Sequence, residues 1–296
     1  MNNLSIFTTY TFLIIATGTC LLAIAAGAVG CITVLKGESL IGDAIGHASF
    51  PGVVLAFIIF LQRDPIILSL GALVCGILAY IVIQVVAKNS KLHFDAILAV
   101  VLSSFFGLGM VLKSYIQGNP MYVRVSQAGL QHYIFGQASY MLESEVKLIF
   151  FIALISISLI IIFFKEIKVF IFDETHSRLI GLNSKIIHFV ILITTMSIIA
   201  IGLKVVGIIL ISSLLIVPAI TAIQWSNKFS IVMIISGVMG GFSAVVGTYI
   251  STAYERMSTG PSIILVMTLI SFVSLIIAPH GIVNQMRFKK NHKEKN

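Results

Sequence analysis

Charged residues are scarce in this sequence, and that scarcity excludes several classes of protein. Asp, Glu, Lys and Arg together make up 10% of its 296 residues, where an ordinary soluble domain holds about 25%. Hydrophobic residues make up 58%, and the mean hydropathy is +1.08. A soluble enzyme is therefore excluded. An outer-membrane barrel is excluded as well, because its strands would appear as alternating segments of about ten residues.

Two kinds of short motif are also missing. The three cysteines, Cys20, Cys31 and Cys75, lie in apolar runs without the Cys-x-x-Cys spacing, so we expect neither a disulfide framework nor a cysteine metal cluster. No GxxxxGK[ST] sequence is present, so the chain is not expected to hydrolyse ATP by itself.

The sequence consists instead of long apolar runs. Each is long enough, or nearly so, to cross a bilayer, which takes about 17–25 residues. The sequence therefore predicts an all-α, polytopic transmembrane bundle of eight or nine spans, forming a single domain over 1–296. The count falls to eight if the hinge at Gly202–Val205 is a bend within one span. The runs are 10–35, 39–62, 65–87, 96–112, 148–164, 186–203, 205–227, 229–254 and 257–286.

The basic residues indicate an orientation. The formal net charge is +8, and the tail 287–296 holds five of the 19 basic residues. With that tail in the cytoplasm and nine spans, 13 basic residues lie inside and six outside, which is the bias expected of a membrane protein. The N-terminus then lies outside, and the charge gives no reason to expect nucleic-acid binding. The longest inner loop is 165–185.

One carboxylate, that of Asp43, falls well inside a predicted span. A carboxylate there costs at least about 2.5–3.5 kcal/mol, so it needs a partner or a function. His47 follows one helical turn later on the same face, and the two side chains form half of a transition-metal site. Pro51 frees the carbonyl of His47 from the helix. A structural hydrogen bond between Asp43 and His47 that locks two helices together explains the same residues.

Two further stretches are candidates for function. Pro218 frees the carbonyl of Leu214 beside Ser212 and Ser213. These serines either line a pathway or serve only in helix packing. The stretch 173–183, DETHSRLIGLN, is predicted to form a short amphipathic helix on the inner surface, capped by Asp173 or Thr175 and ended by Gly181. It also fits an inert loop.

Three stretches together resemble the metal-ion permeases of ATP-binding-cassette importers. They are GESLIGDAIGHASFPGVVLAF, FDETHSRLIGLNSKIIHFVIL, and VVGIILISSLLIVPAITA followed by STGPSIILV. The resemblance implies the type II importer fold and a homodimer in a bacterial cell membrane. It also implies two ATPase subunits and an extracytoplasmic metal-binding protein as partners.

The resemblance also gives roles to residues. It implies that Asp43 and His47 bind the transported metal, and that the stretch 173–182 docks in a cleft of the ATPase as the coupling segment. Pro51, Ser212, Ser213 and Pro218 are then the pathway candidates. The predicted coupling residues are Asp173, Glu174, Arg178, Leu179, Gly181 and Leu182.

The sequence HASFPG is more similar to manganese and iron members of that family than to zinc members. We therefore predict manganese as the transported ion, with zinc or ferrous iron as alternatives, because an Asp–His site barely separates these metals. No permanently bound cofactor is expected. A secondary transporter would carry more acids at mid-membrane. An intramembrane protease would need a second acid or a GxSG serine, and neither is present.

The binding protein must land on the outer face. Arg63, Arg124 and Arg256 are the candidates to meet its acids, because a guanidinium pairs with a carboxylate through two hydrogen bonds. The alternative is that these arginines only reach lipid headgroups.

Overall fold

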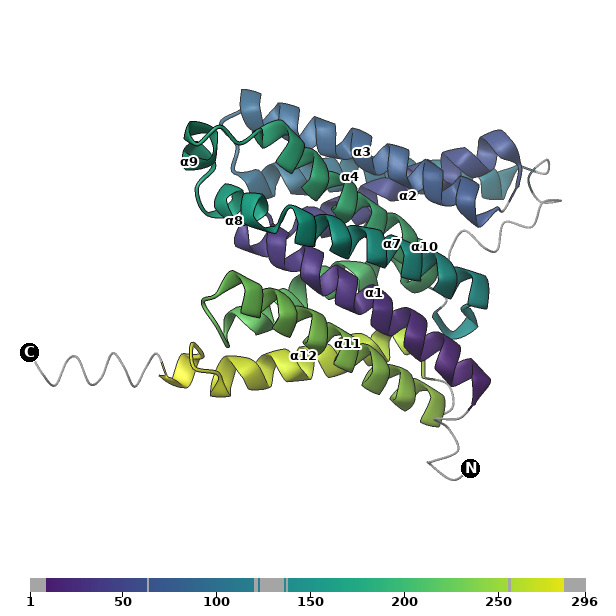
Figure 1. Cartoon of the computed structure of the whole chain (residues 1–296). Helices are drawn as coiled ribbons and strands as arrows, with labels where there is room; N and C mark the ends of the chain where they lie inside the picture. Colours follow the sequence, from purple (N-terminus) through teal and green to yellow (C-terminus); the bar gives the residue numbers. More distant parts are fainter. Residues whose placement is uncertain are drawn as a thin grey trace, which may run out of the picture.

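The computed structural model describes residues 9–62, 64–119, 122, 136, 138–254 and 257–284. Among these residues the structure has helices and no strand. Eight of the helices are long and apolar enough to cross a membrane, and they run alongside one another in a single bundle (Figure 1). In order the elements are α1 (Tyr10–Leu35), α2 (Ile41–Phe60), α3 (Pro65–Asn89), α4 (Phe94–Gly118), the short 3-10 turn η3 (Ala138–Tyr140), α7 (Glu143–Ile162), α8 (Phe164–Phe172), α9 (Glu174–Leu179), α10 (Ser184–Ile223), α11 (Phe229–Ala253) and α12 (Thr259–Ile277).

Helix α10 is folded back on itself. A continuous helix of its 40 residues would be about 60 Å long, twice the thickness of a hydrocarbon core. Gly207 interrupts it with φ 80° and ψ 169°. A Cβ atom on Gly202 would lie 2.5 Å from the Cδ1 atom of Ile211, although about 13 Å would separate these positions along a straight helix. The element therefore has a first arm, 184–206, and a second arm, 208–223.

With both arms counted, the described residues cross the bundle nine times. The predicted reversal at Gly202–Val205 is wrong by a few residues, because the turn lies at Gly207. The φ of +80° there is one that glycine adopts readily and other residues rarely do.

Charged residues gather at the two ends of the bundle. One end, called the basic end below, holds Lys36, Lys88 and Lys185 together around one cavity, with α9 beside them. At the opposite end, Lys204 pairs with Glu145. Figure 1 shows α8, α9 and the last turn of α12 at the basic end, and the start of α1 at the other. This grouping matches the alternation of spans predicted from the basic residues.

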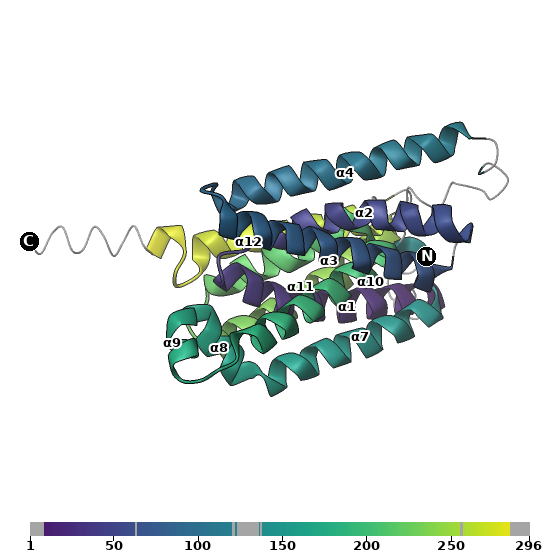
Figure 2. The same ribbon diagram turned by 90° about the horizontal axis from the view of Figure 1, so that it is seen from above.

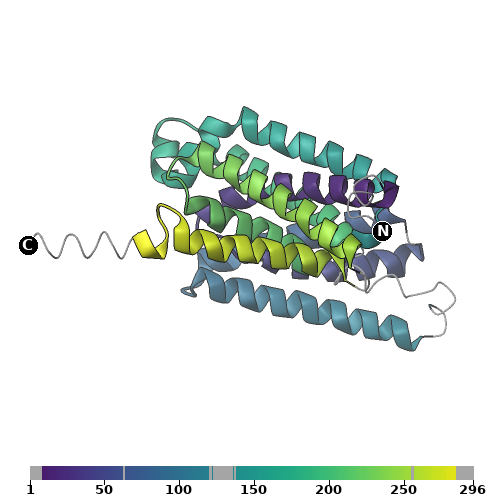
Figure 3. The ribbon, with the colours of Figure 1, turned by 90° about the horizontal axis from the view of Figure 1, so that it is seen from below.

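Burial differs widely between the spans. Helices α10, α1 and α2 are the most buried, while α4, α7 and α12 are the least buried. Figure 2 shows α4 and α7 at opposite edges of the bundle, and Figure 3 shows α4 at the edge again from the other side. The large exposed side chains along the middle of these outer helices are apolar, which suits contact with lipid or with another membrane protein.

Glycines allow the central helices to touch through their backbones. A Cβ atom on Gly30 of α1 would overlap the carbonyl oxygen of Leu215 in the second arm. Gly52 of α2 and Gly71 of α3 meet in the same way. Such small residues are how helices pack closely in membranes, where no hydrophobic effect drives them together.

The contact at Gly30 leads to a stability prediction. We expect Gly30→Ala to cost about 1–3 kcal/mol, because the added methyl group forces α1 away from the second arm. The matched control is Gly107→Ala in α4, where nothing lies within 4 Å of an added Cβ atom. Thermal unfolding of the purified proteins measures both variants. Equal stability of the two would contradict the close contact.

Candidate metal site

Helix α2 begins inside the bundle, and Asp43 lies there because it is close to the start of the helix. It is in the first turn of the helix, which starts at Ile41. Its neighbours face the middle of the second arm: a side chain on Gly42 would meet Leu215, and one on Gly46 would meet Ile208 and Ser212. The amino end of a helix favours negative charge, which offsets part of the cost of keeping this carboxylate away from water.

Asp43 and His47 are neighbours, but they do not hold two helices together. Both are on α2, and the Nε2 atom of His47 lies 3.6 Å from the Oδ1 atom of Asp43, which is longer than a normal hydrogen bond. The Nδ1 atom of His47 is buried and has no hydrogen-bond partner. The imidazole edge meets the ring of Phe106 on α4, with 4.9 Å between the ring centroids. The carboxylate oxygen of Asp43 and the ring nitrogens of His47 are therefore close together, but they do not form a normal hydrogen bond to each other.

Helical geometry shows which way the two side chains point. At 100° per residue, Gly42 and Gly46 face the second arm, whereas Phe50 and Pro51 face α4, where Gly109 packs against them. Counted the same way, Asp43 and His47 lie at the same angle around α2 as Phe50 and Pro51, on the side that faces α4, which agrees with the contact between His47 and Phe106. Their side chains nevertheless remain 37% and 23% exposed, although the residues around them on α2 are buried. Both side chains can therefore be reached from outside the chain.

The structure brings one of the predicted pathway serines to this place. Ser212 lies against Gly46, and its buried hydroxyl has no hydrogen-bond partner. Ser213 donates a hydrogen bond of 2.8 Å to the carbonyl of Ile209 on its own helix. Pro218 is buried on another side of the arm, where it packs near Gly240 of α11.

The contact between α2 and the second arm was not predicted from the sequence. The GxxxG spacing of Gly42 and Gly46 could have indicated it, because this spacing is common where membrane helices pack closely.

The described residues of a single chain supply only part of a metal site. No group of three or more His, Cys, Asp and Glu side chains that could hold a metal occurs among the described residues. The Asp43–His47 pair therefore offers two ligands, whereas transition metals in proteins take four to six. Further ligands are therefore left to water, backbone, residues outside the described part of the chain or another chain.

The predicted inner loop 165–185 forms α8 and α9 at the basic end (Figure 1), and the coupling segment 173–182 comprises α9 and the residues next to it. Asp173 caps α9 by accepting a 2.8 Å hydrogen bond from the amide of His176, and Gly181 follows with φ +82°, as the sequence predicted. Glu174 pairs with Arg178 across one turn. The side chain of Leu179 is 81% exposed.

Leu182 differs from Leu179, although both are among the predicted coupling residues. It is partly buried and packs against the core. The exposed apolar surface of this segment consists instead of Leu179 and Ile180.

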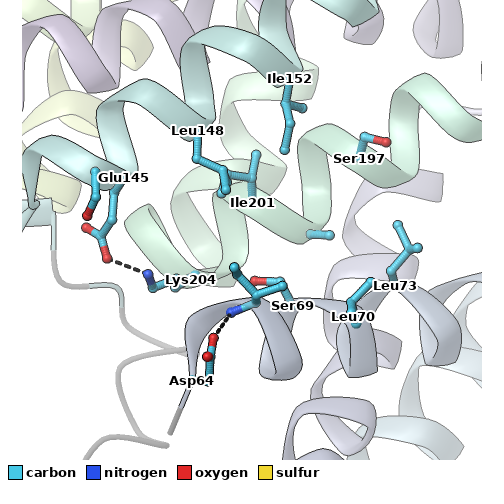
Figure 4. A pocket seen from close by; sticks show the side chains of 13 residues that line it. Asp64, Ser69, Leu70, Leu73, Glu145, Leu148, Ile152, Ser197, Ile201 and Lys204 are labelled. Atoms are coloured by element: carbon cyan, nitrogen blue, oxygen red, sulfur yellow. Dashed lines mark hydrogen bonds and ion pairs between the residues drawn. The ribbon is translucent and has the colours of Figure 1, made fainter.

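The opposite end of the bundle holds a pocket of about 350 Å³ between α3, α7 and the first arm of α10 (Figure 4). Glu145 reaches Lys204 at its rim with 2.5 Å between the charged atoms, and each side chain is 16% exposed. Asp64 caps α3 through the amide of Ile66. The predicted docking residues Arg63, Arg124 and Arg256, and the tail 287–296, lie outside the described residues.

Comparison with protein families decides the identity of the chain. The model of the ABC 3 transport family matches residues 9–278, which is nearly the whole sequence. The chain belongs to this family. The resemblance to metal-ion permeases noted in the sequence is thereby confirmed.

Individual relatives agree with this assignment. The zinc transport system membrane protein TroC of Treponema pallidum is 34% identical over 282 residues, covering 95% of this chain and 94% of that protein. The manganese transport system membrane protein MntC of Bacillus subtilis is 38% identical over 262 residues, covering 88% of this chain. The match spans only 60% of that MntC.

A solved structure confirms the fold. The structure of PsaBC from Streptococcus pneumoniae in complex with Fab superposes with a TM-score of 0.80 at 30% identity, covering 94% of this chain and 96% of that one. The predicted fold class, an all-α membrane permease of the type II importer fold, is correct.

Substitution of Ser212 tests whether this residue belongs to the candidate metal site. Because its hydroxyl has no partner in the structure, we expect Ser212→Ala to keep full thermal stability. We also expect it to weaken metal binding by up to about tenfold, which is at the low end of what residues next to the metal ligands contribute. Ser213→Ala, which removes the next hydroxyl along the arm, is the control. Metal titration of the purified proteins compares them, and equal affinities would separate Ser212 from the site.

Proposed function

We propose that this chain is the permease subunit of an ATP-driven importer of divalent transition-metal ions, and that manganese is the ion. The observation that supports this most directly is the partly exposed Asp43–His47 pair inside the bundle of a chain in the ABC 3 transport family. Relatives named as manganese and zinc transport proteins point to the same class of substrate. Zinc or ferrous iron remains the alternative, because one carboxylate and one imidazole suit all three metals.

The working unit is proposed to be a homodimer. Two copies that meet where Asp43 and His47 are exposed supply two carboxylates and two imidazoles. Four ligands complete a tetrahedral site, and two water molecules added to them complete an octahedral one. The exposure of Asp43 and His47, and the two ligands that a single chain provides, support this arrangement.

The chain supplies a gated path and no covalent chemistry. In this proposal the ion arrives from a metal-binding protein on the outer side of a bacterial cell membrane, with Arg63, Arg124 and Arg256 as the landing residues. It exchanges part of its hydration shell for Asp43 and His47. Two ATPase subunits bind α9 at the basic end, on the cytoplasmic side, and hydrolyse ATP to change the access of the site.

Substitution of the two ligands tests the path. We expect Asp43→Asn or His47→Ala to abolish metal uptake by cells while the protein remains folded and inserted. Asp43→Asn is expected to keep or gain thermal stability, because it removes a charge from the bundle. The control is Asp64→Asn at the start of α3, where the amide oxygen can still accept the hydrogen bond that caps the helix, so stability and uptake are both expected to stay intact. Normal manganese accumulation in either ligand variant would overturn the proposed site.

Substitution in α9 tests the coupling segment. The exposed side chain of Leu179 is expected to enter an apolar cleft of the ATPase, so Leu179→Asp should prevent the two proteins from co-purifying and should stop transport. Leu92→Asp is the matched control, since Leu92 is also exposed and lies in the turn between α3 and α4. Gly181 is a poorer test position, because its positive φ strains any other residue. Full transport by the Leu179→Asp protein would rule out this docking surface.

A further inference from the structure

A second cavity lies at the basic end, away from the Asp43–His47 pair. Its volume is about 1010 Å³, and it is open on one side. Residues near the end of α3 and the start of α10 form its walls, and α9 contributes Glu174 and Arg178. The proposed metal path does not use it.

The charges around this cavity are not balanced. Its two acids are already paired: Glu38 with Lys36 at 2.7 Å, and Glu174 with Arg178. Lys88 and Lys185 also line the cavity, and neither has an acidic partner within 4.0 Å among the described residues. The cavity therefore carries an excess of two positive charges, which favours an anionic ligand.

Neutral groups in the wall also suit an anion. The first arm of α10 begins at Ser184 and directs its first amides toward this end of the bundle, and helix amino ends attract anions. Ser184 lines the cavity, and its Oγ atom is buried without a hydrogen-bond partner. Tyr80 is close by, with its hydroxyl 3.3 Å from the Nδ1 atom of His188.

One wall of the cavity is apolar and continues onto the membrane-facing side of α10. Phe189 and Leu192 follow the basic residues along the first arm, and the side chain of Phe189 is 62% exposed. A free inorganic anion would gain nothing from such a wall. A ligand with an anionic head and a hydrocarbon chain would use both parts.

We propose that this cavity binds the headgroup of an anionic phospholipid from the cytoplasmic leaflet. Lys88 and Lys185 hold the phosphate together with the hydroxyl of Ser184, and an acyl chain lies along Phe189 and Leu192. Basic pockets between membrane helices on the cytoplasmic side are a recurrent form of lipid site. Because Arg178 of α9 also lines the cavity, the bound headgroup lies beside the proposed coupling segment.

Lipid titration of the full purified chain tests this site. Native mass spectrometry counts the phospholipids retained as phosphatidylglycerol or phosphatidylcholine is added. We expect tight retention of phosphatidylglycerol only. Lys88→Gln combined with Lys185→Gln should weaken it roughly 30-fold, since each basic residue near an anionic lipid contributes about fivefold. The control is Lys91→Gln with Lys228→Gln, which removes the same charge from lysines that do not line the cavity and should change binding less than about threefold.

Two further measurements separate the lipid from other ligands. Phe189→Ala should weaken phosphatidylglycerol binding but not the binding of inorganic phosphate. If millimolar phosphate displaces the lipid fully and Phe189→Ala has no effect, the cavity binds a free phosphate and the proposal is wrong. The proposal is equally wrong if the Lys88→Gln, Lys185→Gln protein retains phosphatidylglycerol as well as the unchanged chain does. If that protein keeps its lipid and loses only its association with the ATPase, the cavity is a protein contact.

Discussion

The carboxylate of Asp43 is a charge held inside a membrane bundle, and the surrounding structure offsets what that costs. The side chain stands in the first turn of α2, where the helix amino end favours a negative charge. It is not neutralised by a nearby lysine or arginine among the described ion pairs, and its contact with His47 is long. Such a pair of unsatisfied ligands suits a divalent cation. A transporter requires that the cation bind only transiently.

The reversal of α10 at Gly207 makes this arrangement possible. The second arm packs directly on Gly42 and Gly46 and fixes the depth at which α2 begins. Gly30 of α1 touches the backbone of the same arm at Leu215, the residue whose side chain meets Gly42. A small movement of the arm would therefore change the surroundings of Asp43. The neighbouring first arm begins at the basic end, close to α9, so α10 links the proposed ATPase contact to the site through one element.

The long apolar runs were sufficient to predict the class and the order of spans. The closeness of Asp43 and His47 was also predictable, because a lone carboxylate in an apolar run stands out by the free energy that its burial costs. The turn of α10 was misplaced from the sequence. Most residues around Gly202 and Gly207 are apolar, and this pattern is the same for a helix that continues and for one that reverses. Leu182 was also grouped with Leu179 as a coupling residue, although only Leu179 is largely exposed. That difference depends on where the chain turns after α9, at the positive φ of Gly181, and local pattern does not determine that direction.

The claim that two half-sites form one metal site is tested most directly by the ligands of the bound ion. Pulsed electron paramagnetic resonance of manganese in the purified dimer counts the coordinating imidazole nitrogens and, with metal analysis, gives the number of ions per chain. Paired half-sites predict one ion for two chains, with two equivalent imidazole nitrogens. One ion per chain with a single nitrogen, or an ion with none, would contradict the shared site.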